Sequence, residues 1–325
     1  MKKTFISLLI LSTLLCFVSC NKAKKTDISN KKHIVCTIFP EYDWTSFIRG
    51  NEDYETVLTL TVKNGVDLHS FQPSTQDIVQ ISTCDLFVYV GGESDNWVKD
   101  VLKNATNKNM KVINLMDVLK DNIKEEEIVE GMQAEEEEEE NEGSEEVEYD
   151  EHVWLSIKNA KICCEAITDA MCELVPQNAQ MYKNNLNSYL SELSQLDSEY
   201  ENAITSAAND TIIVCDRFPF RYLADDYNIN YYAAFVGCSA ETEASFETVA
   251  FLANKLNELN LNTVLTLENN NQKIARTVIV NAKKPLCDIF VLDSLQSTTL
   301  RQAFDGKTYI STMKENLETI KKALK

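Results

Sequence analysis

The sequence predicts an α/β protein with two lobes, each built on a parallel β-sheet flanked by helices, and one long rigid helix between them. Two observations support this fold class. Short apolar segments rich in β-branched residues alternate with amphipathic segments in both halves of the chain, as in parallel sheets covered by helices. Between the halves, residues 179–208 contain neither proline nor glycine and carry an apolar stripe at helical spacing. A helix of about 28 residues would span roughly 40 Å, which is long enough to join two lobes.

The individual elements follow from this alternation. In the N-terminal half, 33–178, strands are expected at 33–39, 54–62, 85–91 and 111–116, and helices at 41–50, 75–84, 95–105 and 159–175. In the C-terminal half, 209–325, strands are expected at 211–215, 231–236, 263–268 and 288–293, and helices at 220–228, 245–260, 271–282 and 311–325. With 325 residues, the chain is long enough for two such lobes.

The first residues have the features of a secretory signal. Two lysines follow the first methionine, and the apolar stretch 4–18 is short for a membrane span, which needs about 20 residues. The next letters, "FVSC", resemble a bacterial lipobox, although Phe17 departs from the usual small aliphatic residue. An uncleaved anchor helix is the alternative. We expect a signal peptide at 1–19, a lipidated Cys20 and a polar tether at 20–32.

One segment carries most of the negative charge. The chain has a formal net charge of −20, and residues 124–151 hold 16 acidic residues and one lysine, which leaves −5 for the rest. The segment 124–150 lacks apolar periodicity, so we expect it to be disordered. No basic stripe with interleaved aromatic residues is visible in the sequence, which argues against a nucleic-acid partner.

The acidic run within this segment permits two interpretations. It is either an auxiliary, weak collector of cations or a solvated linker. Carboxylates alone select poorly against calcium and magnesium, so the run cannot form a specific transition-metal site. Its members are Glu135, Glu136, Glu137, Glu138, Glu139 and Glu140.

The ten cysteines show no regular spacing and no CxxC pair. Most lie in apolar runs, where a cysteine behaves as a small hydrophobic residue. Cys238 and Cys287 form one possible disulfide in the C-terminal half. The sequence also contains no glycine-rich phosphate loop, no HExxH and no nucleophile motif, so we assign no catalytic residue and expect no enzyme.

Several candidate ligands follow the expected strands. Ligands of open α/β lobes bind outside the carboxyl ends of the strands. Imidazoles from one lobe and carboxylate or thiolate groups from the other could enclose a metal such as zinc, manganese or iron. The candidates are Glu41, His69 and His152 in the first half, and Cys215, Asp216, Glu268 and Asp293 in the second.

The order of several segments resembles the zinc/manganese class, cluster A-I, of substrate-binding lipoproteins of metal ABC transporters. These segments are "IFPEYDWTSFIRG", "GVDLHSFQPSTQDI", "DLFVYVGGESDNWV", "DEHVWLS", "CSAETEASFETVAFLANKL" and "DGKTYISTMKENLETIKKAL". The motifs "GVDLHSFQPS" and "DEHVWLS" are specific at this separation. The resemblance covers nearly all of the chain after the signal, except the acidic segment.

The resemblance implies an extracytoplasmic lipoprotein, in the periplasm or at the cell surface, that is anchored to the membrane by its lipid. A divalent metal, with zinc the first expectation and manganese or iron the alternatives, would bind in the cleft between the lobes. The protein would act as a monomer and deliver this metal, its transported ligand, to an ABC permease and ATPase. A surface adhesin is the alternative of another class, and a metalloenzyme is disfavoured.

The resemblance also implies a set of metal ligands. His69 and His152 match the ligand histidines of the two specific motifs. Where the family has a third histidine, this sequence offers Asp216, which we prefer, or Cys215. Asp293 matches the fourth ligand, and Glu268 and Glu41 are alternates. A carboxylate in place of an imidazole favours manganese or iron, whereas a Cys215 ligand would favour zinc.

Overall fold

The computed structural model describes residues 31–133, 148–239 and 243–325, and Lys32–Lys325 form one compact unit. The expected signal peptide, the lipidated Cys20, nearly all of the tether and the run Glu135–Glu140 lie outside the described residues. No helix of the described part is long and apolar enough to cross a membrane.

The N-terminal lobe is built on a parallel sheet with the strand order β2-β1-β3-β4. Its strands are β1 (Lys32–Cys36), β2 (Thr56–Leu60), β3 (Leu86–Tyr89) and β4 (Lys111–Asn114). Its helices are α2 (Phe39–Arg49), α3 (Thr75–Thr83), α4 (Trp97–Lys103), α5 (Leu115–Leu119) and α6 (Ile157–Leu174). Strand β4 ends two residues before its expected end because the Asn114 side chain accepts the Asp117 N–H and caps α5.

The C-terminal lobe repeats this arrangement with the strand order β6-β5-β7-β8, again all parallel. Its strands are β5 (Thr211–Phe218), β6 (Asn230–Val236), β7 (Thr263–Leu267) and β8 (Asp288–Leu292). Its helices are α8 (Arg221–Tyr227), α9 (Phe246–Glu258), α10 (Lys273–Asn281), α11 (Leu300–Phe304) and α12 (Tyr309–Ala323). The two parallel sheets confirm the predicted fold class.

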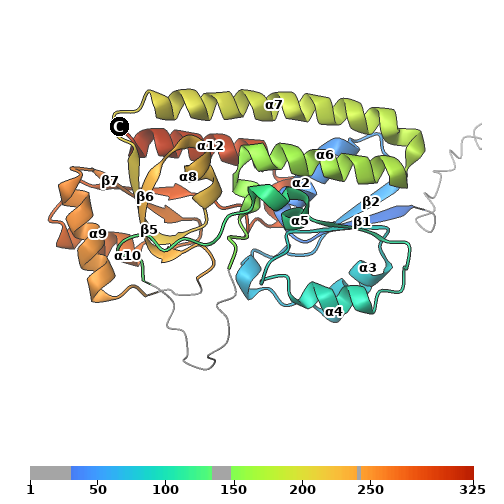
Figure 1. Cartoon of the computed structure of the whole chain (residues 1–325), viewed down its shortest axis with the longest axis horizontal. Coiled ribbons are helices and arrows are strands. Elements are labelled where there is room, and N and C mark those ends of the chain that lie inside the picture. The colour runs from blue at the N-terminus through green and yellow to red at the C-terminus, as the bar shows by residue number, and fades with distance from the viewer. Residues whose placement is uncertain (1–30, 134–147, 240–242) are drawn as a thin grey trace, which may run out of the picture. The chain divides into compact units, whose positions relative to one another are not determined.

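The long helix α7 (Ala179–Thr205) has 27 residues and runs along both lobes (Figure 1). It packs on α2 and α6 of the N-terminal lobe and on α12 of the C-terminal lobe. Its stripe of Tyr182, Tyr189, Leu193, Leu196 and Tyr200 is buried. This apolar face packs the helix against both lobes, so α7 connects them rigidly.

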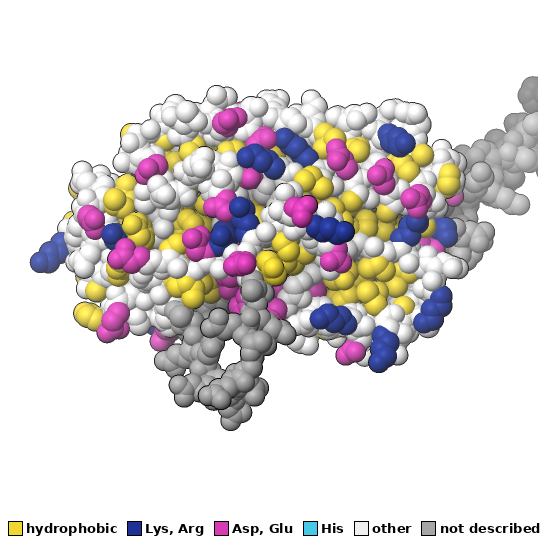
Figure 2. Space-filling model, in the orientation of Figure 1, with side chains coloured by type: hydrophobic (Ala, Val, Ile, Leu, Met, Phe, Trp, Pro, Cys, Tyr) yellow, Lys and Arg dark blue, Asp and Glu magenta, His cyan; other side chains and the backbone are white. Residues whose placement is uncertain are grey.

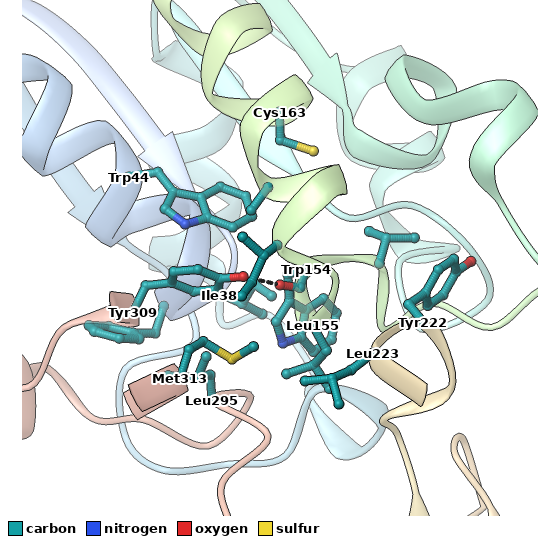
Figure 3. Packing of buried hydrophobic residues seen from close by; sticks show 14 of the residues in the cluster. Ile38, Trp44, Trp154, Leu155, Cys163, Tyr222, Leu223, Leu295, Tyr309 and Met313 are labelled. Atoms are coloured by element: carbon teal, nitrogen blue, oxygen red, sulfur yellow. Dashed lines mark hydrogen bonds between the residues drawn. The ribbon is translucent and has the colours of Figure 1, made fainter. Parts of the chain in front are cut away.

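The two lobes share one apolar core, which surrounds the short 3₁₀ turn η5 (Val153–Leu155). Figure 3 shows Trp154 of this turn beside Tyr309 at the start of α12. The indole N–H of Trp154 donates to the Ser294 carbonyl oxygen at 2.8 Å, and the Tyr309 hydroxyl donates to the Trp154 carbonyl oxygen at 2.8 Å. The Trp44 ring contacts Tyr309 edge-on, with the centroids 5.2 Å apart. These contacts fix the position of η5 relative to both lobes.

Part of the acidic segment is ordered, so the expected disorder from Lys124 is wrong for residues 124–133 and 148–150. The Glu126 N–H donates to the Glu148 carbonyl oxygen at 2.8 Å, and the Gln133 N–H donates to the Ala234 carbonyl oxygen of β6 at 3.0 Å. Backbone pairing of this kind does not require apolar side chains, which explains why composition misses it.

The possible disulfide between Cys238 and Cys287 is also wrong, because both thiols are free. Cys238 follows the carboxyl end of β6, whereas Cys287 precedes the amino end of β8. In a parallel sheet these positions lie at opposite edges, separated by roughly one strand length of 15–20 Å. A disulfide requires Cα atoms within about 7 Å.

Charged side chains of both signs are interspersed on the face of the molecule in Figure 2. Lysine and arginine side chains on the described part of this face alternate with aspartate and glutamate. This distribution differs from the continuous basic surface that binds nucleic acid.

We predict that Trp154→Ala lowers the free energy of unfolding by about 3–5 kcal/mol, because it empties the core that both lobes share and removes the hydrogen bond to Ser294. Urea denaturation followed by circular dichroism measures the change. Phe304→Ala is the control: its side chain is 77% exposed, so its effect should stay within about 0.5 kcal/mol. Equal losses in the two variants would contradict the role of Trp154.

Candidate metal centre

Two imidazoles meet where the N-terminal lobe faces the C-terminal lobe. His69 lies on the 3₁₀ turn η3 (Leu68–Ser70), whose first turn is capped by Asp67, and His152 directly precedes η5. The two Nε2 atoms are 3.1 Å apart. His152 is fully buried, while His69 keeps limited access to solvent. The structure therefore brings the two predicted histidines together.

The outer nitrogen of each ring has its own polar partner. His152 Nδ1 lies 2.9 Å from Asp150 Oδ1, and His69 Nδ1 lies 2.7 Å from Ser94 Oγ. A carboxylate only accepts, so the proton of neutral His152 is assigned to Nδ1. Its Nε2 lone pair then points at His69. A hydrogen bond from the far nitrogen to a carboxylate is the usual orientation device of metal-ligating histidines.

Electrostatics keep His69 uncharged at neutral pH. Burial, followed by the neighbouring His152 and Arg217, lowers the pKa of His69 to about 3, although Asp67 acts in the opposite direction. An imidazole must be neutral to donate its lone pair to a metal. His69 can therefore serve as a ligand without first losing a proton.

A third donor comes from the other lobe. Cys238 follows β6, and its Sγ lies within 4.8 Å of one ring nitrogen of His69 and one of His152, which are equally close to each other. Among residues 31–133, 148–239 and 243–325, this is the one group of three or more His, Cys, Asp or Glu ligand atoms with that spacing.

The site lies beside a cavity of about 420 Å³ between the lobes. His69 and Asp67 line one wall, and Asp216 and Glu268 line the other. Arg217 of β5 forms an ion pair with Asp67 across this cavity. Burial acts to raise the pKa of Asp67, but the Arg217 guanidinium and His69 together outweigh burial, so the pKa of Asp67 lies below its usual value.

The carboxylate of Asp216 accepts hydrogen bonds from within the C-terminal lobe. It accepts the Leu267 N–H at 3.1 Å and the Asn270 side-chain amide at 2.6 Å, and these contacts hold the loop after β7. Glu268 is similarly engaged, because its Oε1 accepts the Ser294 hydroxyl at 2.6 Å. The structure places both carboxylates at the cavity, outside the group formed by the two histidines and Cys238.

The remaining three candidates have partners or packing of their own. Asp293 pairs with Lys307 and does not line the cavity. Cys215 is fully buried in an apolar cluster of the C-terminal lobe. Glu41 is fully buried in the N-terminal lobe, where its Oε2 accepts the backbone N–H groups of Thr37 and Ile38. None of the three belongs to the described group around the imidazoles.

Sequence reasoning missed Cys238 as a candidate ligand, since it considered this residue only as half of a disulfide. A signal was present. The residue follows the carboxyl end of the predicted strand 231–236 with only Gly237 between them, and ligands of open α/β lobes bind at these strand ends.

The loop after β3 supports the imidazoles from behind. The Ser94 N–H donates to Glu151 Oε1 at 2.8 Å, so this loop contacts the segment that carries His152 as well as His69. Gly92 adopts a φ of 78°, and a Cβ there would lie 2.5 Å from Glu151 Oε1. A residue without a side chain is therefore required at this close approach.

The same loop buries a carboxyl group. Asp95 is 3% exposed, its Oδ2 accepts the Gly91 N–H at 3.0 Å, and its Oδ1 has no hydrogen-bond partner in the described part of the chain. Burial raises the pKa of Asp95 to about 7, with a smaller contribution from Glu151 and with the Gly91 N–H acting in the opposite direction.

With this geometry described, comparison with known proteins defines the class. The family of zinc-uptake complex component A, periplasmic, matches residues 34–323, so the chain belongs to that family. The family is a transport component that binds metal, and not a family of enzymes.

Two curated relatives give the range of similarity. The zinc-binding protein AdcA of Streptococcus pyogenes serotype M3 is 29% identical over an alignment of 331 residues that covers 99% of this chain. The chain spans only 61% of the length of that relative. The high-affinity zinc uptake system protein ZnuA of Bacillus subtilis is 28% identical over 315 residues, which cover 95% of this chain and 92% of the relative.

Solved structures agree with the fold. The Zn(II)-bound ZnuA-like domain of Streptococcus pneumoniae AdcA superimposes with a TM-score of 0.69 at 26% identity. The match covers 90% of this chain and 99% of that domain.

Because of Asp95 in the loop after β3, the free energy of unfolding should depend on pH. A carboxyl with a pKa of about 7 when folded, against 3.8 ordinarily, contributes stability that is fully present below 3.8 and lost as the pH rises through 7. Asp95→Asn stays neutral. Its free energy of unfolding relative to the wild type should therefore rise by about 1–3 kcal/mol between about pH 4 and about pH 8.

Urea titrations of the metal-free protein at the two pH values measure this difference. Asp100→Asn, at an exposed position on α4, is the control and should follow the wild type at both. A difference between Asp95→Asn and the wild type that does not change with pH would contradict the burial of a protonated carboxyl.

Proposed function

We propose that this protein captures one divalent transition metal ion, zinc first, between His69 and His152 and delivers it to an ABC permease and its ATPase for import. The observation that supports this most directly is the pair of facing Nε2 atoms, 3.1 Å apart. Two nitrogen ligands at 2.0–2.1 Å from a tetrahedral zinc lie about 3.3–3.4 Å apart. The two rings therefore need to separate by only a few tenths of an ångström.

The surroundings of the imidazoles support binding rather than chemistry. Asp150 and Ser94 hold the outer nitrogens, and the two Nε2 atoms face each other. The metal is the transported cargo, and we assign no general base and no turnover to the site. This agrees with membership of a family of transport components.

The cavity gives a route for the ion, and the shared core limits how the lobes can move. Metal would enter through the 420 Å³ space beside His69. A wide hinge opening would disrupt the core around Trp154 and bend α7, which breaks helix hydrogen bonds. Loading and release therefore depend on local movement of the loops that carry the ligands.

We propose that Cys20 carries a lipid that anchors a monomer at the extracytoplasmic side of the membrane. The tether would leave the cleft accessible to the permease. We also propose that the run Glu135–Glu140 acts as an auxiliary, weak collector of cations.

An adhesin is the alternative of another class. The relatives reported above are named for zinc binding and zinc uptake, and none of these comparisons supports adhesion better than metal capture. The two functions differ in what the cleft must do, since adhesion does not require the imidazole pair.

We predict that His69→Ala and His152→Ala each abolish tight binding of one equivalent of zinc, because either change leaves a single imidazole at the centre. Isothermal titration calorimetry of the metal-free protein measures the stoichiometry and affinity. The third histidine of the chain provides a matched control. His33 is exposed on β1, so His33→Ala should bind zinc as the wild type does. Unchanged affinity in both cleft variants would refute the site.

A further inference from the structure

We propose that the thiolate of Cys238 is the third protein ligand of the metal, so that the site has two nitrogen donors from one lobe and one sulfur donor from the other. This inference rests on the proposed function and specifies its chemistry. It replaces neither histidine. It assigns the third position to a residue of the turn after β6 instead of Asp216 on β5.

The distances support this assignment. The Cys238 sulfur, one ring nitrogen of His69 and one ring nitrogen of His152 all lie within 4.8 Å of one another. On a tetrahedral zinc with a Zn–S bond of about 2.3 Å and Zn–N bonds of about 2.0–2.1 Å, sulfur and nitrogen are separated by about 3.6 Å. The sulfur therefore has to move by at most about 1 Å, which rotation of one side chain achieves.

The turn that carries Cys238 is built against His152. A Cβ on Gly237 would lie 3.2 Å from His152 Nδ1 and 3.0 Å from the Phe218 carbonyl oxygen, so glycine lets the backbone approach this closely. The Cys238 N–H donates to Glu126 Oε1 at 3.1 Å. Glu126 belongs to the ordered part of the acidic segment, which thereby positions the thiol from its other side.

The environment of Cys238 separates it from most of the other cysteines. Cys36, Cys163, Cys164 and Cys215 are buried in apolar clusters, which explains them as packing residues. Cys238 belongs to none of the apolar clusters of the described residues. The carboxyl groups of Asp150, Glu126 and Glu151 lie around this thiol. Packing alone does not explain a thiol among carboxylates beside two imidazoles.

A bound divalent ion would resolve this arrangement. The sulfur loses its proton to solvent as it binds the metal, and the positive charge of the ion offsets the surrounding carboxylates. With three protein donors, a four-coordinate zinc keeps one position for water or another oxygen.

The sulfur donor changes the expected selectivity. A carboxylate at the third position would favour manganese or iron, whereas a thiolate is a soft ligand that favours zinc. A site with two nitrogens and one sulfur should therefore discriminate against manganese more strongly than the set with Asp216. Selectivity would then come from one residue of the C-terminal lobe.

Cobalt(II) is the probe, because a thiolate bound to cobalt gives an intense charge-transfer absorption in the near ultraviolet that imidazole and carboxylate ligands do not give. We expect one equivalent of cobalt to produce this band in the wild-type protein. In Cys238→Ser the band should be absent, and zinc affinity should fall at least tenfold, since even partners that only orient ligands cost about 10–100-fold.

Cys287→Ser is the matched control. Cys287 is also a partly exposed, free cysteine of the C-terminal lobe, but it lies at the opposite edge of the sheet. This variant should keep the band and the wild-type affinity. Circular dichroism and the urea midpoint verify that each variant is folded. If Cys238→Ser does not fold, the spectra of the wild type and of Cys287→Ser still test whether Cys238 binds the metal. The remaining described cysteines lie outside the metal-ligand group, so a band in both proteins would come from Cys238.

The outcomes separate the two proposals. A wild-type protein that binds no equivalent of zinc or cobalt would overturn the proposed function. A wild-type protein that binds one equivalent through His69 and His152 but lacks the band would overturn only the Cys238 ligand. A Cys238→Ser variant that keeps both band and affinity would overturn it as well.

Discussion

The Trp154 side chain joins the two lobes, and the position of the metal centre depends on it. Its indole N–H reaches the Ser294 carbonyl oxygen of the C-terminal lobe, and its own carbonyl oxygen accepts the Tyr309 hydroxyl. His152 lies two residues earlier on the same fully buried segment. The apolar core therefore fixes the imidazole, and Asp150 orients it, before any ion arrives. Because the cost of ordering is met during folding, the site can bind metal without a large rearrangement.

Much of the fold follows from the sequence, because sheet and helix leave different periodicities. The two parallel sheets and the joining helix α7 are confirmed. The structure also brings the two predicted histidines together. Composition does not predict structure that depends on backbone hydrogen bonds. Residues 124–133 are an example, because they form backbone hydrogen bonds to Glu148 and to β6 despite their charge. The prediction of a Cys238–Cys287 disulfide is wrong because the spacing of cysteines along the chain does not show that the two residues lie at opposite ends of the strands.

The third ligand shows a further limit of sequence reasoning. Strand β5 changes register between Val214 and Arg217, so the directions of its last side chains do not follow simple alternation. The Asp216 carboxylate accepts a hydrogen bond from Asn270 in the loop after β7, while Arg217 pairs with Asp67 across the cavity. These directions depend on partners far apart in the sequence. The proposed role of Cys238 likewise depends on the approach of Gly237 to His152, which only the tertiary structure shows.

The central claim is that one metal ion binds where the imidazoles of the N-terminal lobe meet the C-terminal lobe. Crystals of the zinc-loaded protein, measured at the zinc absorption edge, test it most directly. The account predicts one dominant anomalous peak in contact with His69 Nε2 and His152 Nε2, with the Cys238 sulfur as the third neighbour. A dominant peak held by Asp216 or Glu268 without either imidazole would contradict it.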